Sequence, residues 1–339
     1  MCQEMKIAKT VTVVTVTYGQ REQLLRQVLD SVRGMDISKI VVVDNGSQWP
    51  VGAELTAAYG DLVDVVEMGA NTGSAKGFAT GIQRALDLGA EYIWLLDDDN
   101  CPRSDALQKL LKVYTAELAN TLPDRLAVLA FRLEHQADLA RGVPMHRINL
   151  KVNSFRGFNV LDIPYKVWRR THWGRPQLSG QIPEVIGVDL AVYGGLLFHR
   201  KLIQAIGLPN GEFILYGDDI EFTNRIKKVS GQILLVTSAV IDDLESTWNV
   251  KDNFSNSFVC NLEGGADIRA YYSMRNLSYF DSTELLNNKF IFMINLKCYI
   301  LILYVYAISL RRKERFNLLF RAIKDGLSGQ LGQNEKFPL

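Results

Sequence analysis

The amino-acid sequence predicts an α/β protein built on a doubly wound, mostly parallel sheet, followed by a helical C-terminal extension. Two observations predict this class. Short runs of β-branched and apolar residues alternate with stretches whose apolar residues have helical spacing. Acidic residues follow two of the predicted strands, at Asp44 and at 97–99. Because ligands of such sheets bind beyond the carboxyl ends of the strands, we expect the site at this edge.

Four strands and four helices are predicted in the first part of the chain. Residues 11–17 are β-branched throughout, and the apolar run 40–43 ends in the turn signal Asp44-Asn45-Gly46-Ser47. Two further apolar runs predict strands at 63–68 and 92–96. Apolar residues at helical spacing predict the helices 20–33, 51–59, 75–88 and 104–118. Between the third strand and its helix, 71–74 (NTGS) is predicted as a loop.

The second part of the chain is less regular. Residues 137–183 mix aromatic residues with Arg, Gly and Pro, and we interpret them as a long insertion near a substrate. A strand is predicted at 185–198 with Gly194-Gly195 inside it, followed by a short helix at 201–206. Asp218 and Asp219 open another helix, where the helix dipole favours acids. A last strand at 233–241 ends in Asp242-Asp243.

Composition limits the classes of protein. The 339 residues are 47% hydrophobic and 22% charged, typical of a globular protein with one large domain or a domain with an appendage. A net charge of +1 gives no indication of nucleic-acid binding. The four cysteines form no CxxC pair, so we expect no zinc site. Residues 1–10 contain no apolar leader, and a reducing cytoplasm is the simplest setting.

Three consecutive acids, Asp97, Asp98 and Asp99, directly follow the buried run 92–96. Like charges this close repel one another unless a cation lies among them. Hard ions such as Mg²⁺ and Mn²⁺ prefer carboxylate oxygens, and Mg²⁺ commonly bridges to phosphate. The cluster therefore indicates either a metal–diphosphate site or a solvated acidic turn formed with Asn100 and Pro102.

The last seventy residues differ from the rest. Residues 290–310 form a largely apolar stretch just long enough to span a bilayer, although Lys297 near its middle would be costly there. A basic cluster, Arg311, Arg312, Lys313 and Arg315, follows directly. Three interpretations stay open: a helix in a membrane interface facing anionic lipid, a core or oligomer-interface helix, and a true span.

Several segments together resemble inverting glycosyltransferases of family 2, which have the GT-A fold. The resemblance covers roughly 11–245 and, more loosely, 267–329. Its order and spacing are specific, although each segment alone is not: VTVVTVTYGQREQL, VVVDNGS, NTGSAKGFATGI, WLLDDDN, VYGGLLFHR, LYGDDIEFTNRI, RAYYSMRN and AIKDGLSG. The WLLDDD segment and the RxYYxxRN string at 269–276 resemble most the bacterial rhamnosyl- and galactofuranosyltransferases of cell-surface polysaccharide synthesis.

The resemblance implies a metal-assisted single displacement with a carboxylate base. It implies that Asp97 and Asp99 hold a divalent metal, Mn²⁺ or Mg²⁺. Asp219 would be the catalytic base and Asp218 its orienting neighbour. The alternative for these two acids is capping of their helix.

The resemblance also implies a set of donor contacts along the sheet edge. Thr15, Thr17 and Tyr18 would grip the base and Asp44 the base or ribose, whereas Asp98 would contact the ribose or sugar. Asn71, Gly73 and Lys76 would line the nucleotide, and Gly194-Gly195 would permit close approach of the backbone to the donor sugar. The alternatives are β-propensity for Thr15, turn formation for Asp44, a solvated lysine for Lys76 and a bulge at the glycines.

One departure from the family pattern concerns the metal. Many members place a metal-binding histidine after the strand that ends here at Ile241, where this chain has Asp242-Asp243. We expect Asp242 to supply an oxygen ligand instead. Residues 246–258 with Trp248 are interpreted as a lid over the donor.

The functional expectation is transfer of a sugar, most consistently from UDP-galactofuranose or dTDP-rhamnose, to a lipid-linked glycan. Residues 1–265 form the expected catalytic domain, with a nucleotide-binding half at about 1–130 and an acceptor-binding half at about 131–265; 266–339 form the helical, membrane-associating region. We expect a cytoplasmic protein peripheral to the inner membrane, without nucleic acid and with a homo-oligomer as an open alternative. The competing functions are a nucleotidyltransferase, and an inactive membrane-docked scaffold.

Overall fold

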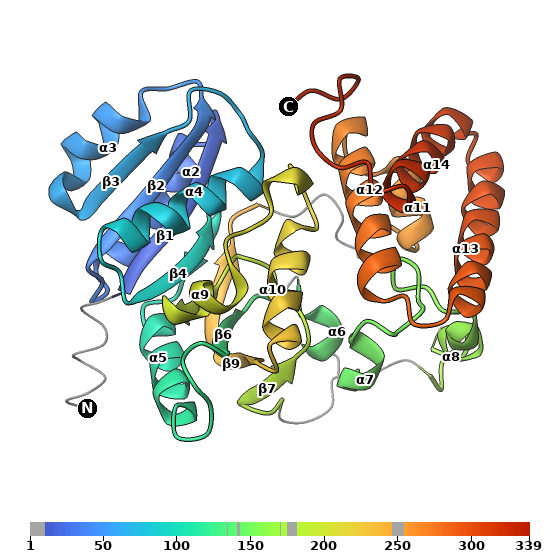
Figure 1. The fold of residues 1–339 in the computed structure, drawn as a ribbon, viewed down its shortest axis with the longest axis horizontal. Helices are drawn as coiled ribbons and strands as arrows, with labels where there is room; N and C mark the ends of the chain where they lie inside the picture. Colours follow the sequence, from blue (N-terminus) through green and yellow to red (C-terminus); the bar gives the residue numbers. More distant parts are fainter. Residues whose placement is uncertain (1–10, 134, 141–142, 170, 175–181, 246–253) are drawn as a thin grey trace. The chain divides into compact units, whose positions relative to one another are not determined.

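The computed structural model describes residues 11–133, 135–140, 143–169, 171–174, 182–245 and 254–339 (Figure 1). The chain forms two compact units that are interleaved along the sequence. The first comprises 1–136, 182–211 and 218–245, and the second comprises 137–181, 212–217 and 246–339. The predicted domain boundary at residue 265 stays a prediction. Trp248 and most of the predicted lid lie outside the described residues.

The first unit is built on one mixed sheet with the strand order β3-β2-β1-β4-β8-β6-β9-β5, and β7 pairs with β9. Among the described residues, six of the nine strands run in one direction, while β5, β7 and β8 run against them. The predicted α/β class with a mostly parallel sheet is confirmed. The strands are β1 (Val11–Gly19), β2 (Lys39–Ser47), β3 (Val63–Glu67), β4 (Tyr92–Asp97), β5 (Asn100–Pro102), β6 (Leu126–Phe131), β7 (Val185–Val188), β8 (Leu196–His199) and β9 (Gln232–Asp243).

Helices of the first unit lie close to the predicted ranges: α2 (Glu22–Arg33), α3 (Val51–Tyr59), α4 (Ser74–Asp87), α5 (Ala106–Glu117), α9 (Lys201–Ile206) and α10 (Asp218–Lys228). The apolar face of α2 is buried, as its spacing predicts. Gly77 and Gly81 let α4 lie close against β1, because a Cβ at either position would come within 2.7 Å of a valine side chain of β1. This packing brings the N-terminus of α4 to the edge where β1 ends.

Two strand predictions need correction. The single strand predicted at 185–198 is two strands, β7 and β8, because the chain leaves the extended conformation between them and Gly195 has a φ of +96°. The acids Asp242 and Asp243, predicted to follow the last strand, are the final residues of β9. Sequence analysis missed β5 and β6, although the six residues of β6 are all buried. In the insertion, the described residues form the short helices α6 (Ala137–Ala140), α7 (Met145–Ile148) and α8 (Ile163–Trp168).

The second unit contains the predicted helical C-terminal region: α11 (Ser257–Glu263), α12 (Asp267–Glu284), α13 (Lys289–Ser309) and α14 (Lys313–Leu327). A separate apolar core of this unit includes Tyr271 and Tyr272 of α12, Leu303 of α13 and Leu319 of α14. Within the described part of the chain, α13 is the one helix long and apolar enough to cross a membrane by length and composition, and 33% of its most apolar window is buried.

Candidate active site

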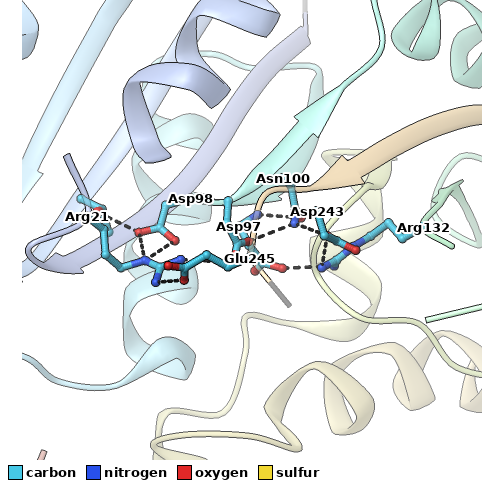
Figure 2. A network of polar contacts seen from close by, with 9 residues as sticks. Arg21, Asp97, Asp98, Asn100, Arg132, Asp243 and Glu245 are labelled. Carbon is cyan, nitrogen blue, oxygen red and sulfur yellow. Dashed lines mark hydrogen bonds and ion pairs between the residues drawn. The ribbon is translucent and has the colours of Figure 1, made fainter. Parts of the chain in front are cut away.

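The acidic cluster lies where β4 ends and the chain turns into β5. Asp97 is the last residue of β4, and Asp98 and Asp99 form the turn (Figure 2). The Asp98 side chain is buried, whereas Asp97 and Asp99 are partly exposed. The sequence left open whether this cluster is a metal site or a solvated turn. Burial of Asp98 and the ion pairs described next show that it is not simply a solvated turn.

Arg21 neutralises one side of the cluster. It immediately precedes α2, and its Nε donates to both carboxylate oxygens of Asp98 at 2.9 Å (Figure 2). Its remaining nitrogens donate to Asp99 at 3.1 Å and to Glu245 at 2.6 Å. The hydroxyl of Thr17 donates to Asp98 at 2.9 Å. Thr17 and Asp98, both predicted to contact the donor, are therefore brought together, and Asp98 is held by protein partners.

Arg132, at the end of β6, neutralises the other side. Only 5% of its side chain is exposed; it lies 3.2 Å from Asp97 and donates to Asp243 through Nε at 2.8 Å. Asn100 links the two sides, since its amide nitrogen donates to Asp99 at 3.2 Å and to Asp243 at 3.0 Å (Figure 2). Asn100 Oδ1 accepts from the backbone N–H of Asp97 at 3.1 Å. Two buried or half-buried arginines thus supply positive charge to these acids.

Asp243, and not the predicted Asp242, joins the cluster. Successive side chains of a strand point to opposite faces, and β9 pairs Asp243 with Asn100. Asp242 instead forms an ion pair with Arg103 at 3.0 Å, with both side chains more than half exposed. A metal-binding role for an acid after Ile241 stays a prediction, and of the two acids it is Asp243 that lies beside Asn100 and Arg132.

The donor set of the cluster suits a hard divalent cation. Its ligand atoms are carboxylate oxygens, and burial together with the Asp97 and Asp98 charges raises the pKa of Asp99 to about 7, which shows that negative charge is crowded here. Within the ranges that the structure describes, no three His, Cys, Asp or Glu side chains are already arranged around one metal position. Magnesium-type ions are commonly held by one or two carboxylates plus substrate phosphates, so a metal role for Asp97 and Asp99 stays a prediction that this donor set fits.

Asp218 and Asp219 lie in the first turn of α10. Asp218 is 2% exposed, and the Ser74 hydroxyl at the start of α4 donates to it at 3.2 Å. Burial raises the pKa of both carboxyls above the usual 3.8, and their mutual proximity raises that of Asp218 further. The Asp97 carboxylate also raises the pKa of Asp219 and Arg132 lowers it, so Asp219 is electrostatically linked to the acidic cluster. Asp219 accepts from the N–H of Ile220 at 2.7 Å, and its role as base, like the alternative of capping the helix, stays a prediction.

Gly194 lies directly against the polar cluster. A Cβ at this position would fall 2.1 Å from Asn100 Oδ1, 2.2 Å from an Arg132 nitrogen and 2.6 Å from Asp97 Oδ2. Gly195, with positive φ, instead faces Ala130 and Ile241. Because Gly194 has no side chain, Asn100, Arg132 and Asp97 can pack this close to its backbone. Approach of either glycine to a donor sugar stays a prediction.

The remaining predicted donor contacts lie along the same edge of the sheet. Asp44 accepts from the N–H of Ser47 at 2.8 Å, the turn contact that was its alternative. Asn71 accepts from Asn45 at 3.1 Å and from the N–H of Gly73 at 3.0 Å, and so it orders its own loop. The lysine and tyrosine of this set, Lys76 and Tyr18, are exposed. Thr15 is fully buried, and within the described residues its hydroxyl has no hydrogen-bond partner.

Residues 12–164 match the family model described as "Glycosyl transferase family 2". A curated relative, galactofuranosyltransferase GlfT1 of Mycolicibacterium smegmatis, is 31% identical over 229 residues, which cover 66% of this chain and 67% of the relative. This chain belongs to glycosyl transferase family 2.

Two further comparisons agree with the family. GlfT1 of Mycobacterium tuberculosis is 27% identical over 225 residues, or 65% of each chain, and the dTDP-rhamnosyl transferase RfbF of Shigella flexneri is 22% identical over 78% of this chain and 77% of RfbF. The alignments with the two GlfT1 proteins thus span about two thirds of their length. Among solved structures, S. aureus TarS 1–349 in complex with UDP-GlcNAc aligns over 95% of this chain and 83% of that chain at 14% identity, with a TM-score of 0.49.

Sequence analysis of this family 2 glycosyltransferase missed five residues of the site: Arg21, Ser74, Asn100, Arg132 and Asp243. Arg21 follows the first strand, so its proximity to the sheet edge was a usable signal. Arg132 follows β6, a strand that was not predicted, so no signal placed it. Predicting Asp243 requires the pairing register between β5 and β9. Side chains along a strand alternate between its two faces, so the register decides which of two consecutive acids faces the cluster.

Replacing Gly194 by alanine is expected to lower the turnover of the glycosyltransferase about 100-fold, because the added methyl group displaces Asp97 and Arg132 by an ångström or more. Gly187→Ala is the matched control, since a Cβ there meets nothing within 4 Å. Steady-state kinetics on both variants, together with thermal unfolding, measure the effect. Equal turnover in the two variants would contradict the role given to Gly194.

Proposed function

We propose that this glycosyltransferase moves a sugar, with inversion, from UDP-galactofuranose or dTDP-rhamnose to a hydroxyl of a lipid-linked glycan during synthesis of a cell-surface polysaccharide of the O-antigen or capsule type. One observation carries the proposal: the acids that end β4, held between Arg21 and Arg132, belong to the same compact unit as Asp218 and Asp219 at the start of α10. The unit thus contains both a candidate base for the acceptor and groups suited to the leaving diphosphate. The similarity to the galactofuranosyltransferase GlfT1 and the dTDP-rhamnosyl transferase RfbF supports the choice of donors.

The reaction is a single displacement in which the acceptor oxygen attacks the anomeric carbon and the nucleoside diphosphate leaves. Asp219 takes the proton of the acceptor hydroxyl, and its raised pKa brings its basicity closer to the working pH. Arg132 and Asn100 hold Asp97 and Asp243 in place before the donor binds. Asp97 and Asp99 would hold a divalent ion, whose positive charge would stabilise the leaving diphosphate when bound.

Transfer from a panel of sugar nucleotides tests the proposal. The protein is incubated with Mn²⁺, a lipid-linked acceptor extract and UDP-galactofuranose, dTDP-rhamnose or UDP-hexopyranoses, and the released nucleotide is identified by chromatography. We expect acceptor-dependent release of UDP or dTDP. Consumption of the sugar nucleotide only when pyrophosphate is added, with formation of UTP or dTTP and a sugar 1-phosphate, would indicate a nucleotidyltransferase instead. No product with any donor, together with failure to bind UDP or dTDP, would support the inactive scaffold.

The pH dependence of transfer follows from the raised pKa of Asp219. Only the deprotonated carboxylate accepts a proton, so kcat is expected to rise with pH through a transition that lies above 3.8, the usual aspartate value. Rates measured with saturating substrates across the pH range locate this transition. A transition at the usual value would show that burial and Asp97 do not control the base.

We further propose that α13 docks the protein on an anionic membrane surface, which places the enzyme beside its lipid-linked acceptor. Residues Phe292, Leu296, Tyr299, Leu303 and Ala307 form the buried stripe of α13. Its opposite face is apolar and exposed, with Leu301 at 62%, Val305 at 57% and Phe290 at 74%. Lys297 lies on that exposed face, and the exposed Arg311, Arg312 and Lys313 follow the helix. Apolar area beside basic charge matches anionic lipid.

Replacing Leu301, Val305 and Ile308 by serine is expected to weaken binding to vesicles that contain anionic lipid by about tenfold or more. Vesicle flotation measures binding, and Leu161→Ser, a single change of the same kind at an exposed residue outside α13, is the control. If the wild-type protein does not float, the membrane proposal is wrong. A wild-type dimer that the triple variant converts to a monomer would assign this face to a second copy of the chain.

A further inference from the structure

The segment that leads into the catalytic helix has an unusual backbone. Residues 212–217 belong to the second unit, and Gly217 is bonded directly to Asp218, the first residue of α10. Within the segment, Ile214 and Tyr216 both have φ of 64° and Gly217 has φ of 80°. Positive φ is a true outlier for a β-branched residue such as Ile214. Backbone of this kind persists only where surrounding structure enforces it, and it clusters at functional sites.

Asn276 of α12 supplies the enforcing contacts. Its side chain is fully buried, and Nδ2 donates to the carbonyls of Phe213 at 2.6 Å, Leu215 at 2.9 Å and Tyr216 at 2.8 Å. One amide therefore serves three carbonyls of the strained segment. The Phe213 ring also packs edge-on against Tyr279 of α12, with the ring centroids 5.9 Å apart. The segment is fixed on both its polar and its apolar side.

Arg275, the preceding residue, fixes the orientation of that amide. Its Nε donates to Asn276 Oδ1 at 2.8 Å, which directs Nδ2 towards the three carbonyls. Another of its nitrogens donates to the carbonyl of Gly332 at 2.5 Å. The guanidinium carbon lies 4.7 Å from the ring centroid of Tyr272 and 5.8 Å from that of Tyr271. The tyrosines, the arginine and the asparagine of the RxYYxxRN string thus form one support.

We propose that Arg275 and Asn276 are positioning residues for the catalytic acids: they hold 213–217 in its strained conformation and thereby set how Asp218 and Asp219 enter α10. The RxYYxxRN string at 269–276, on which the narrower family resemblance rests, thus has a structural role in this proposal. The inference rests on the proposed role of Asp219 as the base, and it extends that role to residues distant from it in sequence.

Asn276→Ala tests the inference, with Asn295→Ala as the matched control. Asn295 is also a fully buried asparagine of the second unit; it donates to the carbonyl of Asn153 at 2.8 Å and accepts from the N–H of Val160 at 2.9 Å, so these hydrogen bonds order 153–160 and not 212–217. Both variants remove one buried amide, so comparable losses of stability are expected. Asn276→Asp is a second variant that keeps the shape of the side chain and leaves no cavity. Its ionised carboxylate cannot donate a hydrogen bond to the three carbonyls.

Two readouts are measured at temperatures where each variant is folded. Asn276→Ala and Asn276→Asp are expected to lower kcat by about 10- to 100-fold, with the dissociation constant for UDP or dTDP changed less than about twofold. Hydrogen exchange of peptides covering 213–221 is expected to speed up in these variants. Asn295→Ala is expected to leave kcat and this exchange at wild-type values.

Equal losses of kcat in the Asn276 and Asn295 variants, or unchanged exchange at 213–221 in Asn276→Ala, would overturn the inference. If the wild-type protein transfers no sugar from any donor, the proposed function fails separately. The exchange comparison then still decides whether Asn276 orders the segment that precedes Asp218.

Discussion

Asp219→Asn is expected to lower kcat by about 10²- to 10⁴-fold while donor binding is retained, because an amide has nearly the same shape but cannot take the acceptor proton. Single-turnover transfer and nucleotide-binding titrations on the same preparation measure the two effects. Glu221→Gln is the matched control, since Glu221 lies in the same first turn of α10 but forms an ion pair with Arg225 at 3.1 Å. This variant is expected to keep most of the activity.

Measuring the stability of Asp219→Asn distinguishes a loss of catalysis from misfolding of the variant. Folding raises the pKa of Asp219, so between the unfolded and folded values the native state binds more protons and stability falls as the pH rises. At neutral pH, removing this charge is therefore expected to leave the unfolding midpoint unchanged or higher. A variant that transfers sugar at the wild-type rate would rule out Asp219 as the base, and a less stable variant would contradict the stated burial of its charge.

Arg132→Met is expected to lower the free energy of unfolding by about 3–5 kcal/mol, because it leaves the carboxylates of Asp97 and Asp243 without their buried cation. The Asp243 side chain is only 3% exposed, and it cannot compensate through water without local opening. Urea unfolding of the intact protein measures the change. Transfer is expected to fall as well, since Asp97 loses the partner that holds it.

The same sheet contains a matched control for this arginine. Arg103 pairs with Asp242, the neighbour of Asp243, but both side chains are largely exposed. Arg103→Met is therefore expected to change the free energy of unfolding far less than Arg132→Met does. In the double variant Arg132→Met and Asp243→Asn, part of the lost stability is expected to return. Equal costs at Arg103 and Arg132 would show that burial of the cluster is not what makes Arg132 important.

The sequence predicted those parts of the fold that depend on local pattern. The β-branched run of β1, the helical spacing in α2 and the acids after β4 each depend on a few neighbouring residues, and the structure confirms the elements they predict. The predictions that were incomplete are those that depend on the pairing of strands distant in the sequence. The choice between Asp242 and Asp243 is set by the register of β9 against β5, a strand of three residues.

The cations of the site were harder to predict than its acids. Asp97, Asp98 and Asp99 are consecutive and draw attention, whereas Arg21 and Arg132 are single basic residues in a chain with 38 lysines and arginines. Nothing local distinguishes Arg132, since its role follows from the position of β6 between β8 and β9. The order of strands brings it to Asp97 and Asp243. The apolar face of α13 was predicted from composition, but only the structure shows which of its side chains remain exposed.

The central claim is a single displacement in which Asp219 activates the acceptor and the groups around Asp97 receive the leaving diphosphate. The anomeric configuration of the transferred sugar, determined by NMR on the purified product, tests it most directly. One displacement inverts the anomeric carbon, so we predict a product of opposite configuration to the donor. Retention of configuration would require a different course of reaction and would contradict the roles given to both halves of the site.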